Sequence, residues 1–303
     1  MNFEQQQRNP LRGVVAVPTT PFAPDGDIDK KAYQRIIRRL VDAGITTVTP
    51  NGNTGEFYAL NPGEAKEVTR LAVESVDPDT TVMVGVGHDV ASAVDAALEA
   101  RSRGATLIMV HQPVHPYVSV EGWIEYHRAI ASEVPELGVV LYVRNEAIPG
   151  AAFARLGELC PNVVGVKYAV ANPARFAAVA ADAGAGRFTW VAGSAELHAP
   201  GYFAVGATGF TSGLANVDPE TSLRLWRALD AGERVLVTDL WQRVRPFEEL
   251  RAADANANNV SVVKEALCQL GVCARDVRPP SSLLPTQARA EITRILEAWG
   301  LLG

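Results

Sequence analysis

Residues 81–110 read TVMVGVGHDVASAVDAALEARSRGATLIMV. Apolar residues, many of them β-branched, open and close this stretch, and an alanine-rich tract follows Asp89, a residue type that caps helix N-termini. The order strand, helix, strand is typical of a unit in a parallel sheet, whose strands are buried on both faces and do not alternate in polarity. The stretch therefore predicts one repeating unit of a βα fold.

The same unit recurs along the chain. Helical patterns such as 30–43, 62–76 and 120–133 separate the apolar runs. An open doubly wound sheet uses the same alternation, but no GxGxxG sequence links an early strand to a helix. We therefore predict an α/β protein with a (β/α)₈ TIM barrel. Its strands are expected at 14–17, 46–49, 81–86, 106–110, 139–143, 163–167, 188–191 and 207–210.

Only helical patterns follow residue 216, at 219–229, 234–251, 260–270 and 285–296. The first can serve as the eighth barrel helix, and the other three are expected to form a C-terminal helical appendage. Turn-like residues lie at 254–259 and 278–282. We therefore assign residues 1–230 to the barrel, which carries the active site, and residues 231–303 to the C-terminal helical region.

Composition excludes several classes of partner. The net charge is −6, and acidic and basic residues are interspersed, so no basic stripe is available for nucleic acid. No segment approaches the roughly 18 uninterrupted apolar residues of a membrane span, and the N-terminus lacks a signal-like apolar stretch. Three cysteines without CxxC spacing imply neither a disulfide framework nor a zinc cluster. We expect a cytoplasmic protein.

Catalytic groups of such barrels come from the C-terminal ends of the strands. The run at 163–167 ends in Lys167, where burial would lower the pKa and favour a nucleophilic amine. Tyr142 lies at the end of the preceding run and could relay protons. The turn at 51–56, NGNTGE, offers backbone N–H groups for an anion and the Thr54 hydroxyl. Each feature also has a structural explanation. Lys167 could pair with a carboxylate or reach solvent, Tyr142 could be a core tyrosine with a satisfied hydroxyl, and the turn at 51–56 could be purely structural.

Together these three motifs resemble the family of dihydrodipicolinate synthase and N-acetylneuraminate lyase. Further matches occur near both ends of the chain, at 14–21 and 262–266, so the resemblance covers nearly its whole length. It implies a homotetramer or dimer that condenses a lysine with pyruvate or another small 2-oxo acid, without a metal or organic cofactor. It further implies that Lys167, Tyr142 and Thr54 are catalytic and that Asn53, Gly55, His115, Arg144, Gly193 and Thr211 bind substrate.

The chain departs from the synthase pattern at specificity positions. Paired tyrosines of the synthases correspond to Val114 and His115, although Tyr117 is close by in sequence. The arginine that binds the aldehyde substrate corresponds to Ala147, and Arg144 is the nearest arginine. Most members have Ser or Thr where this chain has Asn53. These departures argue against the lysine-biosynthetic reaction itself and leave the second substrate open, as an aldehyde or a sugar acid.

Three alternatives follow. The string Tyr142-Val-Arg-Asn145 looks like the branch of 5-dehydro-4-deoxyglucarate dehydratase, a decarboxylating lyase, although Lys167-Tyr-Ala replaces the Lys-Asp-Gly of that enzyme. A catalytically silent 2-oxo-acid-binding protein would keep the pocket without turnover. A metal-dependent aldolase would use three histidines at strand ends, but their spacing matches no recognised ligand pattern. These histidines are His88, His111 and His115.

Overall fold

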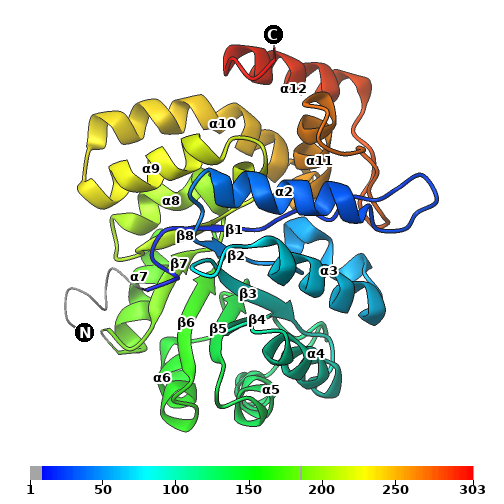
Figure 1. The fold of residues 1–303 in the computed structure, drawn as a ribbon. Coiled ribbons are helices and arrows are strands. Elements are labelled where there is room, and N and C mark those ends of the chain that lie inside the picture. The colour runs from blue at the N-terminus through cyan, green and yellow to red at the C-terminus, as the bar shows by residue number, and fades with distance from the viewer. Residues whose placement is uncertain (1–8, 185, 303) are drawn as a thin grey trace.

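The computed structural model describes residues 9–184 and 186–302. It contains a closed barrel of eight parallel strands that neighbour one another in chain order (Figure 1). The predicted (β/α)₈ barrel is therefore confirmed. The strands are β1 (Val14–Ala16), β2 (Thr47–Val48), β3 (Thr81–Val86), β4 (Leu107–Val110), β5 (Gly138–Val143), β6 (Val163–Tyr168), β7 (Thr189–Ala192) and β8 (Gly209–Ser212).

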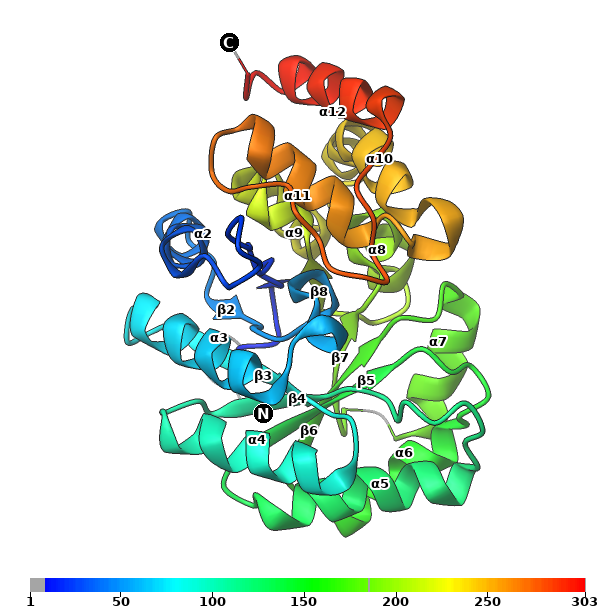
Figure 2. The same ribbon diagram turned by 90° about the vertical axis from the view of Figure 1, so that its right-hand side faces the viewer.

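A helix follows each strand and covers the outside of the barrel (Figures 1 and 2). Polar side chains start most of these helices as expected, and the Asp89 carboxylate accepts the Ser92 N–H at 2.9 Å. The barrel helices are α2 (Lys30–Asp42), α3 (Pro62–Ser75), α4 (Val90–Ser102), α5 (Val120–Glu133), α6 (Gly150–Leu159), α7 (Pro173–Asp182), α8 (Ala195–Phe203) and α9 (Pro219–Ala231).

The eighth strand differs from its predicted position by two residues. The apolar run at 207–210 suggested a strand there, but the Ala207 N–H bonds to the Tyr202 carbonyl at the end of α8. Pairing with β1 instead continues to Thr211 and Ser212, opposite Val15 and Ala16. Backbone pairing thus extends the strand into polar residues, and Thr211 lies within β8.

Three further helices lie on one side of the barrel, and the first of them packs against α8 and α9 (Figures 1 and 2). They are α10 (Arg234–Asn256), α11 (Asn259–Gln269) and α12 (Thr286–Ala298). The helical geometry of α10 breaks at Ala253–Ala255, which overlaps the start of the turn expected at 254–259. Because α11 contacts the short 3₁₀ helix η1 (Asn53–Gly55), the C-terminal region touches the polar turn after β2.

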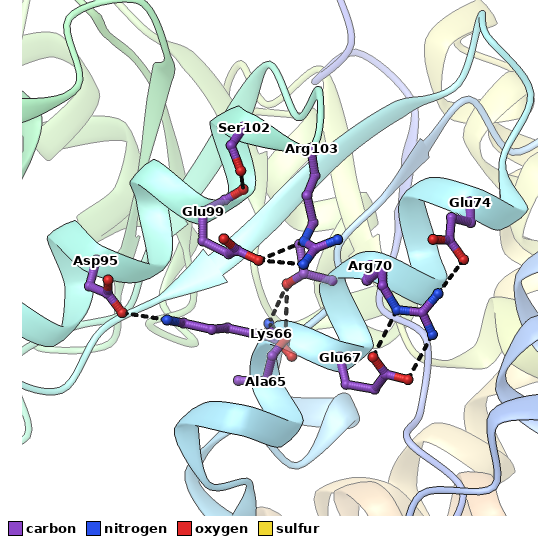
Figure 3. Close-up of polar contacts among 11 residues, drawn as sticks. Ala65, Lys66, Glu67, Arg70, Glu74, Asp95, Glu99, Ser102 and Arg103 are labelled. Atoms are coloured by element: carbon purple, nitrogen blue, oxygen red, sulfur yellow. Dashed lines mark hydrogen bonds and ion pairs between the residues drawn. The ribbon is translucent and has the colours of Figure 1, made fainter.

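The outer surface of α3 and α4 carries ion pairs (Figure 3). Lys66 on α3 reaches Asp95 on α4 at 2.8 Å, and Arg70 contacts both Glu67 and Glu74 on its own helix. Exposed pairs of this kind contribute little net stability because water screens them. The fold is therefore stabilised mainly by apolar packing between the strands and the surrounding helices.

No helix in the described ranges is both long and apolar enough to span a membrane. The three cysteines are all free thiols, and Cys160 is buried.

Candidate active site

Lys167 and Tyr142 face the inside of the barrel near the carboxyl ends of β6 and β5. Strand register pairs Tyr142 directly with Lys167, so the two side chains project from the same face of the sheet. The Lys167 ammonium nitrogen lies 4.5 Å from the centroid of the Tyr142 ring, and Lys167 is buried. On the same strand, Gly165 has no side chain, and the Leu11 side chain packs against it. A Cβ at this position would lie 2.4 Å from a methyl carbon of Leu11. The predicted pair is therefore brought together inside the barrel, next to packed side chains of its interior.

Burial changes the acid–base behaviour of this lysine. Loss of hydration, followed by the positive charges of Arg144 and Arg251, lowers the pKa of Lys167 to about 7. A large share of the amine is then neutral near neutral pH, whereas an exposed lysine is almost fully protonated. A neutral buried amine is the form that attacks a carbonyl carbon.

The hydroxyl of Tyr142 is held by Asn53. The Asn53 side-chain N–H donates to the phenolic oxygen at 2.7 Å, and burial raises the pKa of Tyr142. In the described part of the chain it is this amide, rather than the Thr54 hydroxyl, that bonds Tyr142. The side-chain carbonyl oxygen of Asn53 is buried and has no partner among those residues, so it is an available acceptor at the site.

The turn after β2 is tied to the C-terminal region through Glu56. This residue has a left-handed backbone, with a φ of 59°. Its carboxylate pairs with the buried ammonium of Lys264 on α11 and accepts the Arg278 N–H at 2.8 Å. Lys264 also donates to the Asp276 carbonyl at 2.7 Å. The ion pair therefore fixes η1, whose N–H groups are the predicted carboxylate donors.

A cavity of about 420 Å³ opens above Lys167. Most of the site residues expected from the sequence line it, at the end of the barrel where such sites are found. Gly55 lies outside the lining, and its carbonyl accepts the Thr20 hydroxyl at 2.8 Å. The expected residues in the lining are Asn53, Thr54, Tyr142, Arg144, Lys167, Gly193 and Thr211.

His115 lies in a separate cavity of about 580 Å³ that borders the first. The two cavities share Asn53, Tyr142 and Arg144. His115 is exposed, and its Nδ1 lies 2.9 Å from the Tyr117 carbonyl oxygen within the same loop. The structure therefore places His115 beyond the lining that surrounds Lys167.

Sequence reasoning missed the part of the cavity wall that the C-terminal region supplies, which includes Glu248, Arg251 and Asn259. Arg251 on α10 donates to the Glu248 carboxylate at 2.6 Å and to the Asn259 side-chain carbonyl at 2.6 Å. All three line the cavity. An available signal was the three-residue spacing of Glu248 and Arg251, which puts them on one helix face.

His111, one of the histidines considered as metal ligands, makes other contacts in the structure. The ring of His111 stacks on Phe57 with centroids 4.1 Å apart, and burial lowers the His111 pKa to about 3. Its ring nitrogens lie 2.9 Å from the Asn51 carbonyl oxygen and 3.2 Å from the Tyr58 hydroxyl. Within residues 9–184 and 186–302, no three His, Cys, Asp or Glu side chains are grouped so as to hold a metal ion.

Comparison with known proteins gives a consistent match. The model of the "Dihydrodipicolinate synthetase family" matches residues 10–299. A relative from Rhodococcus opacus, named "Probable 5-dehydro-4-deoxyglucarate dehydratase", is 32% identical over 289 residues, which cover 94% of each chain. A relative of the same name from Rhizobium rhizogenes is 30% identical over 94% of each chain.

Solved structures of the same family also superpose on this chain. The dihydrodipicolinate synthase from Bacillus clausii superposes with a TM-score of 0.93 at 35% identity, covering 97% of this chain and 99% of its own. A prophage protein of the dihydrodipicolinic acid synthase family from E. coli K12, solved in complex with pyruvate, superposes with a TM-score of 0.86 at 26% identity. That match covers 96% of this chain and 99% of the other.

Proposed function

Since the chain belongs to the dihydrodipicolinate synthetase family, we propose that it is a lyase or aldolase that forms a Schiff base between Lys167 and pyruvate or a related 2-oxo acid. The observation that carries this proposal is the buried Lys167 amine, whose nitrogen lies 4.5 Å from the Tyr142 ring centroid and whose pKa is about 7. A lysine that merely packed against the barrel would not need to border an open cavity.

The chemistry follows from the positions of these groups. The neutral Lys167 amine adds to the ketone carbon of the substrate, and the carbinolamine then loses water to give an iminium. The Tyr142 ring lies beside the amine, and its hydroxyl carries protons during these two steps. The iminium then draws electrons from the neighbouring carbon, so that a bond to that carbon is made or broken. The N–H groups of Asn53 and Thr54 hold the carboxylate.

A second candidate is a decarboxylating dehydratase that acts on a sugar diacid. Arg144 favours it, because this arginine lines the cavity while Ala147 stands at the position of the synthase arginine. The relatives from Rhodococcus opacus and Rhizobium rhizogenes carry that name. Both candidates begin with the same iminium, so one trapping experiment tests them together.

The test is incubation with pyruvate and borohydride, followed by intact mass spectrometry and peptide mapping. We expect one reduced adduct on Lys167 and none in Lys167→Ala, whose circular dichroism spectrum should match the wild type. Lys66→Ala, which changes an exposed lysine, should be trapped normally. If folded wild-type protein formed no adduct with pyruvate or with longer 2-oxo acids, the Schiff-base mechanism would be wrong and a silent binding protein would be favoured.

We also propose that the protein assembles as a homotetramer or dimer. The loop after β4 supports this, because Tyr117 is 84% exposed and Val114 is 57% exposed. Apolar side chains gathered on one surface loop are typical of an interface between subunits. A cytoplasmic location stays a prediction from the sequence.

A further inference from the structure

We propose that Arg251, reaching in from α10, binds the substrate carboxylate together with the turn after β2, so that the C-terminal region completes the 2-oxo-acid site. The inference rests on the proposed function and deepens it, because it names a second group that recognises the acid. It gives the helices beyond the barrel a direct contact with substrate.

The first support is the close approach of Arg251 to Gly213 and Thr54. A Cβ on Gly213 would lie 2.3 Å from an Nη atom of Arg251 and 3.1 Å from the Thr54 hydroxyl oxygen. The guanidinium therefore lies against the backbone of Gly213, with Thr54 nearby. Only a glycine at this position leaves room for that arrangement. The arginine thus comes next to the turn that is expected to hold the carboxylate.

The second support is the hydrogen-bonding capacity that Arg251 retains. A guanidinium carries five N–H groups. Glu248 and the side chain of Asn259 each accept one from the two Nη atoms, and the Asn259 backbone carbonyl lies 3.4 Å from Nε. Each Nη atom keeps a second hydrogen without a bond to any described residue. Because Arg251 lines the cavity, these donors are available to a bound anion.

The third support is the unusual backbone that follows this arginine. Asp254, Ala255 and Asn256 follow it with φ values of 52°, 55° and 71°, which are unusual for residues other than glycine. Strained backbone of this kind is found preferentially at functional sites. The unusual turn brings Asn256 and Asn259 into the same cavity wall as Arg251.

A competing explanation is that Arg251 only neutralises the buried carboxylate of Glu248. The two explanations differ in what Glu248→Gln does. If Arg251 binds substrate, this variant retains the arginine and keeps most of the affinity. If Arg251 only neutralises Glu248, Glu248→Gln loses as much affinity for the substrate as Arg251→Gln does.

The experiment measures the concentration that gives half-maximal borohydride trapping, for pyruvate and for the uncharged analogue pyruvamide. Arg251→Gln should raise this concentration about 10- to 100-fold for pyruvate, because a charge-assisted hydrogen bond to the carboxylate is lost. For pyruvamide the change should stay below about twofold, provided that both ligands are measured near pH 9, where the Lys167 amine is largely neutral with or without the Arg251 charge. The double variant Glu248→Gln/Arg251→Gln leaves no unpaired buried charge and should show the same selective loss. Arg245→Gln, on the same helix but outside the cavity lining, is the matched control.

The outcomes separate the two proposals. Suppose that the wild type is trapped normally. If Arg251→Gln then weakened trapping equally for pyruvate and pyruvamide, or did not weaken it, the role of Arg251 would be overturned and the Schiff base would stand. An equal loss in Glu248→Gln would also overturn that role. A wild type that is never trapped would remove the proposed function, and this inference with it.

Discussion

At the scale of single residues, the proposed chemistry depends on an amine kept away from water. Lys167 is buried and has two arginines in its electrostatic surroundings, and both effects disfavour the ammonium form. Exposure to solvent would return its pKa towards 10.5 and leave little free amine at pH 7. The barrel therefore supplies reactivity through its environment rather than through an unusual side chain.

A pH profile should reveal this environment. The neutral amine is the reactive form, so the rate of trapping with dilute pyruvate should rise about tenfold per pH unit below 7 and level off above it. Arg144→Met removes a positive charge that disfavours the ammonium, so the pKa of Lys167 should rise and the inflection should move to higher pH. The measurement is the rate of adduct formation from pH 5 to 10. An inflection that stays in place, or moves down, would contradict the contribution of Arg144.

The central pair of the site was predictable because its residues end consecutive apolar runs, and strand register makes them neighbours. Asn53, Thr54, Gly193 and Thr211 were expected from the family resemblance, at or after the ends of β2, β7 and β8. Arg251 was not predictable in this way, because its approach to the cavity depends on helix packing far along the chain. His115 was expected at the site, but its loop turns its imidazole towards Tyr117.

At the scale of elements, the turn after β2 depends on a helix of the C-terminal region. Glu56 and Lys264 form a buried ion pair, and Lys264 also lies 4.0 Å from the centroid of the Phe22 ring. A carboxylate deprived of its partner in such a position is strongly destabilising. The pair therefore links the turn after β2 to α11.

Lys264→Met should test this link. Loss of the ammonium leaves Glu56 buried and unpaired, which is expected to cost about 3–5 kcal/mol in the free energy of unfolding. Adding Glu56→Gln removes the orphaned charge and should recover part of that stability. The measurement is urea unfolding followed by tryptophan fluorescence, with Lys66→Met as an exposed control that should behave like the wild type. A double variant no more stable than Lys264→Met would show that the charge is not the cause.

The elements were largely predictable, since hydrophobic periodicity reports burial directly. Helix α5 coincides with its expected range, and α2 differs by one residue. The strands were less exact, because backbone pairing decides their ends. Thr211 and Ser212 show this, since they join β8 through β1 despite their polarity.

At the scale of the whole molecule, assembly should depend on the loop after β4. Tyr117→Glu places a charge on its most exposed apolar residue and should lower the mass of the particle in solution, because a buried charge opposes association. Light scattering after size-exclusion chromatography measures this mass. Leu159→Glu, at the end of α6 and 48% exposed, is the control and should leave the mass unchanged. A wild type that is monomeric at all concentrations would disprove the predicted assembly.

The wall formed by α10 and α11 allows two parts of the molecule to diverge at different rates. A strand residue is packed on both sides, so each replacement in the barrel must be compensated by its neighbours. The junction at Asp254–Asn256 is exposed and can change more freely. A change at this junction can therefore alter which molecules enter the cavity while the buried lysine of the proposed chemistry is kept.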